Sequence, residues 1–100
     1  MTRIRMIADD RKKQLLEAGY KIARTKGIRK VTRASVAREC KVSHGLLNHY
    51  FDGREGLRSE VMAFAIEQKD AKTLAACAVH YELDDFGMGR ELKREVSALM

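Results

Sequence analysis

The stretch from Thr32 to Phe51 constrains the fold of this 100-residue chain most strongly, because it predicts two short helices joined by a tight turn. Thr32 is suited to cap the first helix, since its hydroxyl can accept a hydrogen bond from a free backbone N–H of the first turn. Lys41 and Val42 form the expected turn, and Ser43 can cap the second helix. The sequence therefore predicts a helix-turn-helix in which each helix has its own start signal.

The second helix of this pair has two unlike faces. Leu47 lies three and four positions before Tyr50 and Phe51, so these bulky side chains share one face and are expected to point inward. A helix that packs on one side and is small and polar on the other can lie in the major groove of DNA and contact base edges. The small polar face consists of His44, Gly45, Asn48 and His49.

The same residues follow a longer pattern. Its core is Val42-Ser43-His44-Gly45-Leu46-Leu47-Asn48-His49-Tyr50-Phe51, with Arg54, Glu55 and Leu57 at fixed distances after it. This segment resembles the signature of the tetracycline-repressor (TetR) family, V-S-x-G-T-L-Y-x-Y-F followed by a basic residue, an acid and a leucine. The resemblance extends from about Arg11 to Met62. Four positions depart from the family pattern: Asn48 replaces tyrosine, Leu46 threonine, Lys41 glycine and Arg54 lysine.

The resemblance implies a sequence-specific DNA-binding transcriptional regulator, a repressor, that binds a palindromic operator in double-stranded DNA as a homodimer. Asn48 has the groups to bind an adenine edge, and Leu46 could touch a thymine methyl. By the resemblance, Thr32, Arg33, His49, Tyr50 and Arg54 are placed to hold phosphates. The full set of expected DNA-binding residues is Thr32, Arg33, Ser35, Ser43, His44, Gly45, Leu46, Asn48, His49, Tyr50 and Arg54.

The charge distribution agrees with a polyanion-binding N-terminal part. Residues 1–58 carry 15 Lys and Arg against 6 Asp and Glu, a balance of +9. Residues 59–100 carry 5 against 8, a balance of −3. A basic half beside a mildly acidic half suggests that only the first binds nucleic acid. A solvated basic surface would give the same numbers, so the helix-turn-helix pattern decides between the two.

We predict an all-α fold: a three-helix bundle with a helix-turn-helix, followed by a long helix and a short C-terminal helix. The first helix is expected to start at Asp9 or Asp10 and to end at Lys26 before Gly27. The long helix should start near Arg54, with a seam close to a heptad repeat. That seam consists of Leu57, Val61, Phe64, Gln68, Ala71 and Ala75.

The last helix is expected after a break at residues 84–89, which hold two aspartates and two glycines. Its apolar stripe of Leu92, Val96 and Leu99 is too short to be stable alone in water and needs a partner surface. We therefore predict two parts, a helix-turn-helix head at residues 1–58 and a helical dimerisation segment at residues 59–100. The alternative is a monomer in which the last helix folds back on its own chain.

Other function classes have little support in the sequence. No glycine-rich phosphate loop, nucleophile-base pair or metal-ligand spacing is present, so we expect no enzyme, no cofactor and no metal site. No apolar run is long enough for a membrane span, and the expected location is the cytoplasm. We also expect no small-molecule pocket in a chain of this length. The competing hypothesis is a small helical protein-interaction module or adaptor, which would show no salt-dependent DNA binding.

Overall fold

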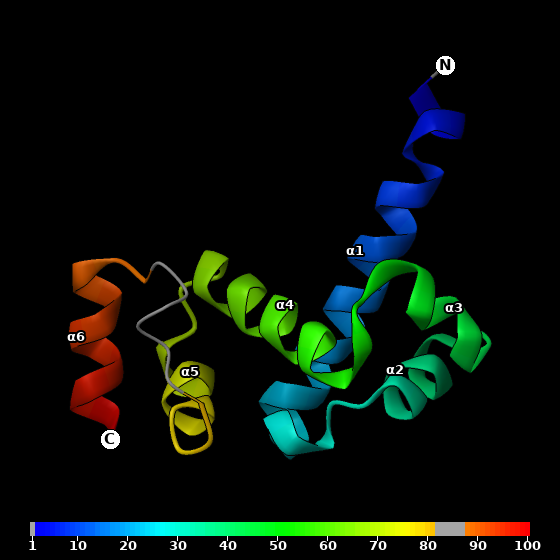
Figure 1. Cartoon of the computed structure of the whole chain (residues 1–100). Helices are drawn as coiled ribbons and strands as arrows, with labels where there is room; N and C mark the ends of the chain where they lie inside the picture. The colour runs from blue at the N-terminus through cyan, green and yellow to red at the C-terminus, as the bar shows by residue number, and fades with distance from the viewer. Residues whose placement is uncertain (1, 82–87) are drawn as a thin grey trace.

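Every regular element in the described part of the chain is a helix, as the sequence predicted (Figure 1). The computed structural model describes residues 2–81 and 88–100, with side chains from residue 10 onward within those ranges. The elements are α1 (Thr2–Lys26), the 3₁₀ helix η1 (Ile28–Lys30), α2 (Arg33–Cys40), α3 (His44–Tyr50), α4 (Gly53–Glu67), α5 (Ala71–Cys77) and α6 (Arg90–Leu99).

Helix α1 is the central support of the molecule. It packs against α2, α4 and η1, while α2 carries α3 on its other side. Helix α4 leads away from this three-helix head to α5, and α6 packs on α5 (Figure 1). The helix-turn-helix therefore lies at one end of the molecule and α6 at the other.

Close packing of α1 on α4 depends on Gly19. A Cβ added to Gly19 would lie 2.7 Å from Val61 Cγ2, nearer than two carbon atoms can approach. The absent side chain thus lets the two helices meet. Leu15 and Leu57 are fully buried in the resulting core. This core fixes the position of α4, whose first turn contributes to the site described below.

The prediction for α1 is right at its C-terminal end and wrong at its start. The predicted C-terminal end is confirmed: α1 ends at Lys26, and Gly27 adopts a φ of 104°, which glycine adopts without strain. The predicted start is wrong, because α1 begins at Thr2 and both Asp9 and Asp10 lie inside the helix. No glycine or proline separates residues 2–8 from the rest of the helix, so nothing stops the helix from extending to Thr2.

The expected long helix is interrupted. Helix α4 ends at Glu67, Lys69 adopts a left-handed φ of 55°, and a separate helix α5 begins at Ala71. Asp70 caps α5, since its Oδ1 accepts from the Thr73 backbone N–H (3.1 Å) and its Oδ2 from the Thr73 hydroxyl (2.7 Å). The seam predicted from Leu57 to Ala75 therefore belongs to two helices. The turn lets α5 pack back on α4.

The stripe on α6 finds its partner within the same chain. Leu92 and Val96 are buried where α6 packs on α5, and only Leu99 of the predicted stripe is exposed. The expectation that a second copy covers Leu92 and Val96 is therefore wrong. Residues 84–87 of the predicted break lie outside the described residues, and Gly89 directly precedes α6.

Candidate nucleic-acid interface

The two helices of the helix-turn-helix begin at the caps that the sequence predicted. Thr32 Oγ1 accepts from the Ser35 backbone N–H (3.0 Å), and Ser35 Oγ accepts from the Thr32 backbone N–H (2.9 Å). This reciprocal pair satisfies two backbone donors that a helix start leaves free. Ser43 Oγ accepts from the Leu46 N–H (3.3 Å) at the start of α3. The Ser35 hydroxyl also donates to the Lys30 carbonyl (2.8 Å), so its predicted DNA contact would compete with a structural bond.

The turn between the two helices depends on a lysine in a left-handed conformation. Lys41 has φ 58° and ψ 45°, and its N–H donates to the carbonyls of Ala37 and Arg38. The Val42 N–H donates to the Ala37 carbonyl over 3.0 Å. These bonds satisfy the last carbonyls of α2 and set the angle at which α3 leaves it.

Helix α3 separates its residues into an inner and an outer face as predicted. Leu47 is 0% exposed and Phe51 is buried, while Tyr50 and Leu46 are half-buried. Gly45 has open space on its outer side, since an added Cβ there would meet no atom within 4 Å. The exposed residues of α3 are His44, Gly45, Asn48 and His49.

The N-terminal ends of α2, α3 and α4 converge on one hollow of about 490 Å³. Unpaired N–H groups and the helix dipole make each helix start favourable for an anion. The hollow also contains two carboxylates, and Glu55 pairs with Arg54 at 3.4 Å. Its lining residues are Thr32, Arg33, Ala34, His44, Asp52, Gly53, Arg54 and Glu55. Four predicted site residues, Thr32, Arg33, His44 and Arg54, thus line the same hollow.

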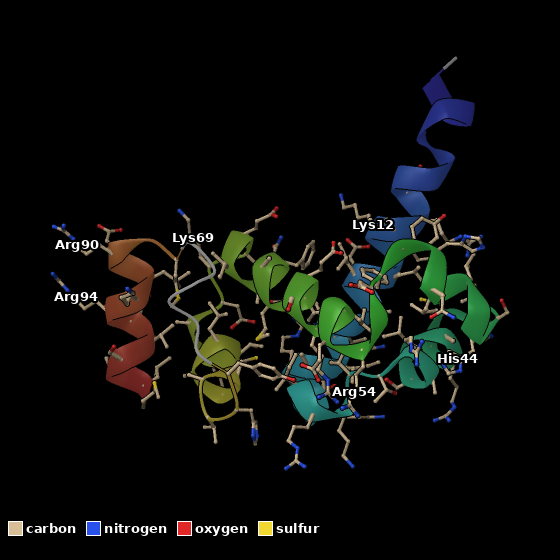
Figure 2. The ribbon with its side chains drawn as sticks, in the orientation of Figure 1. Lys12, His44, Arg54, Lys69, Arg90 and Arg94 are labelled. Atoms are coloured by element: carbon tan, nitrogen blue, oxygen red, sulfur yellow. The ribbon has the colours of Figure 1, made fainter. Side chains whose placement is uncertain are left out.

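Arg33 and Asn48, both predicted site residues, are in direct contact. Arg33 Nη1 donates to Asn48 Oδ1 over 2.7 Å, which joins the first turn of α2 to the outer face of α3. In Figure 2, His44 and Arg54 lie at the helix-turn-helix end of the molecule, and Arg90 and Arg94 lie on α6 at the far end. Arg33 thus connects the hollow, which it lines with Thr32, His44 and Arg54, to Asn48 on the outer face of α3.

The helix-turn-helix lies in a segment that is similar to known proteins. Residues 15–61 match the family model described as bacterial regulatory proteins, tetR family. We refer to residues 15–61 as the TetR-family segment on the basis of this match. The match begins at Leu15 in α1 and ends at Val61 in α4, so it contains the whole helix-turn-helix.

Individual relatives of the TetR-family segment are regulators by name. The chain is 37% identical over 60 residues to the HTH-type transcriptional regulator BetI of Vibrio atlanticus, covering 60% of this chain and 30% of that protein. It is 34% identical over 61 residues to BetI of Vibrio campbellii, covering 61% of this chain and 31% of the relative. The chain thus spans about a third of the length of these relatives. No solved structure matches the chain significantly.

Arg58 supports the TetR-family segment in a way that the sequence did not reveal. Its side chain is 7% exposed, with Nε donating to the Val31 carbonyl (2.9 Å) and Nη2 to the Arg29 carbonyl (2.7 Å). Nη1 donates to the Tyr81 hydroxyl (3.1 Å). The guanidinium therefore holds the backbone directly before Thr32. An arginine in an amphipathic helix gives no sequence signal for such burial.

The described residues show no sign of a reactive cysteine, a metal site or a membrane span. Burial, and then the charge of Glu39, raises the pKa of the Cys40 thiol, and burial with the charge of Asp70 raises the pKa of Cys77 to about 11. Both thiols are therefore held in the protonated, weakly nucleophilic form. Within the described residues, no group of three His, Cys, Asp or Glu could hold a metal ion, and no helix is long and apolar enough to cross a membrane.

Proposed function

We propose that this chain is a sequence-specific DNA-binding transcription regulator, a repressor, that places α3 in the major groove. The observation that carries the proposal is the outer face of α3, which is small, polar and exposed while Leu47 on the inner face is fully buried. A rigid helix with such a face fits the groove. The match of residues 15–61 to a family of bacterial regulators supports the same conclusion.

In this proposal base contacts give sequence preference, and phosphate contacts hold the protein on the DNA backbone. His44, Gly45, Leu46 and Asn48 lie nearest the bases and supply sequence preference. Backbone phosphates bind at the hollow where three helices begin, with Arg54 as its exposed cation. The remaining phosphate contacts come from Thr32, His49 and Tyr50. The protein acts as a binder of double-stranded DNA in the bacterial cytoplasm and catalyses no reaction.

We further propose that two copies bind one inverted repeat. A two-fold pair places its recognition helices about 34–36 Å apart, one turn of B-DNA, or a multiple of that distance. The described chain exposes large apolar side chains at Val79 (71%), Leu99 (58%) and Met100 (72%). They line one hollow with Lys72, Ala75 and Ala76 between α5 and α6. This α5–α6 patch, rather than the buried Leu92 and Val96, is the proposed contact between copies.

Binding to DNA selected from a random duplex pool tests the proposed function. Affinity for the selected duplex should fall steeply with salt, because neutralised phosphates release counterions. Arg54→Ala should weaken binding to all duplexes alike and make the salt slope shallower by about one unit. Arg94→Ala on α6 removes the same charge far from the head and should leave the slope unchanged. Absence of salt-dependent binding would instead favour a protein-interaction module.

Light scattering tests the proposed pairing. The chain has a mass of 11.4 kDa, so a dimer should scatter with twice that mass. Val79→Glu should return the protein to the monomer mass and weaken binding to an inverted repeat, while binding to one half-site is kept. Arg94→Ala, which lowers the net charge by the same one unit but lies outside that hollow, is the control for an effect of charge alone. A monomer mass for the unaltered protein at micromolar concentration contradicts the pairing.

A further inference from the structure

The hydrogen bond between Arg33 and Asn48 connects a half-buried and an exposed side chain at the proposed DNA interface. Arg33 Nη1 donates to Asn48 Oδ1 over 2.7 Å. A guanidinium carries donors only, so the amide atom that faces it is the oxygen, and the Asn48 NH₂ group is turned away from Arg33. We infer that Arg33 and Asn48 form one base-contacting unit that favours guanine over adenine at one position of each half-site. The inference rests on the DNA-binding function proposed above.

The chemistry of the pair determines the base that it favours. With Oδ1 turned toward Arg33, the pair presents the Asn48 NH₂ group and the remaining Arg33 N–H groups, all of which are donors. In the major groove guanine presents two acceptors, N7 and O6, whereas adenine presents the N7 acceptor beside the N6 amino donor. The pair therefore matches guanine, and an adenine N6 would meet a guanidinium donor.

The guanidinium of Arg33 is available to contact a base, because no fixed carboxylate pairs with it in the described residues. No carboxylate in the described residues lies within salt-bridge distance of Arg33, although Asp52 and Glu55 line the same hollow. Its positive charge is thus not neutralised by a fixed partner. The bond to Asn48 also holds both side chains in one arrangement before DNA arrives, which lowers the entropy lost on binding. An unpaired Asn48 would be free to offer both its oxygen and its NH₂ group to adenine instead.

Base preference in matched duplexes tests the inference. A duplex is first selected from a random pool with the unaltered protein. Each guanine of its half-site is then exchanged for adenine in turn, and the position whose exchange effect changes in Asn48→Ala is taken as the one that the pair contacts. The unaltered protein should bind the guanine duplex roughly tenfold or more tightly. Arg33→Ala should abolish or invert this ratio, because the freed Asn48 Oδ1 can accept from adenine N6. Arg33→Lys, which keeps a donor at this place, should retain part of the guanine preference.

Two further measurements serve as controls. Arg94→Ala, distant on α6, should keep the full ratio, and circular dichroism should show that each variant remains helical. If Arg33→Ala keeps the same ratio, or if the unaltered protein prefers adenine, the inference is overturned while the proposed function stands. If the unaltered protein enriches no sequence from the pool, the proposed function fails and the inference fails with it.

Discussion

The hydroxyl of Tyr81 donates a hydrogen bond to Glu55 Oε1 over 3.0 Å, across 26 positions of the sequence. Tyr81 lies just after α5, whereas Glu55 belongs to the first turn of α4 and lines the hollow at the helix starts. The same hydroxyl accepts from Arg58, which in turn binds the backbone at Arg29 and Val31. The C-terminal helices are thus tied to the part of the head that is proposed to hold phosphate.

Arg58 and Arg54 should separate stability from DNA binding. Arg58→Ala leaves the carbonyls of Arg29 and Val31 without the guanidinium donor and should lower the free energy of unfolding by ~3 kcal/mol. Arg54 is exposed, so Arg54→Ala should change stability by no more than about 0.5 kcal/mol while weakening DNA binding. Urea unfolding and DNA titration of both variants provide the measurements. Equal losses of stability would contradict the structural role of Arg58.

Local signals explain which parts of this site could be predicted from the sequence. Thr32, Ser43 and Gly27 each act within a few residues of their own position, and all three were placed correctly as helix caps or ends. The outer face of α3 follows from helical periodicity alone. Each of these features depends on residues that are close in the sequence, so the sequence pattern is enough to predict it.

Of two features that escaped prediction, only one depends on residues far apart in the chain. Arg33 meets Asn48 only because the turn at Lys41 folds α3 across the start of α2. The break before α5 did have a local signal, since Asp70 is a good helix cap with Thr73 three positions later. The apolar seam outweighed that signal in the prediction. In the structure, the cap and the hydrogen bond from Tyr20 hold Asp70 at the break.

The contact between Tyr20 and Asp70 should make stability depend on pH at both extremes. Burial and the hydrogen bond to Asp70 raise the pKa of Tyr20 to about 12. Its contribution to stability is therefore complete below the unfolded pKa of about 10 and is lost as pH rises toward 12. Burial raises the pKa of Asp70, but hydrogen bonds from Tyr20 and Thr73 outweigh it and hold that pKa below its usual value. The Asp70 contribution is lost as pH falls below about 4.

Tyr20→Phe isolates this effect. The variant keeps the aromatic ring that packs edge-on against Phe64 but has no proton to lose. Its urea midpoint should be lower than that of the unaltered protein at neutral pH, and it should decline less between about pH 9 and pH 12. All other groups are the same in both proteins, so the difference between the two curves reports Tyr20. Parallel curves would show that the hydroxyl contributes nothing.

Lys41 offers a test of the turn. Its left-handed φ of 58° is unfavourable for any residue with a Cβ, so Lys41→Gly should stabilise the protein by ~1 kcal/mol. Lys41→Ala removes the same charge but keeps the Cβ, and it should leave stability nearly unchanged. Thermal unfolding of the three proteins distinguishes conformation from charge. The conformational explanation is wrong if the glycine and alanine variants are equally stable.

Gly45 should show that stability and DNA binding can move in opposite directions. An added Cβ at Gly45 meets no protein atom, so Gly45→Ala should stabilise α3 by up to ~1 kcal/mol through lower backbone entropy in the unfolded chain. On the DNA side that methyl group would stand between the helix and the groove, and binding should weaken. Gly45→Leu should weaken it further.

The matched control for this test is Gly89→Ala. Gly89 also has open space at its Cβ position, but it lies directly before α6, at the end of the molecule away from the head. The Gly89 variant should bind the selected duplex as tightly as the unaltered protein. Fluorescence anisotropy on one labelled duplex compares all the variants under the same salt. If Gly45→Ala bound that duplex as tightly as Gly89→Ala does, the close approach of α3 to the groove would be excluded, because a close contact leaves no room for the added methyl group.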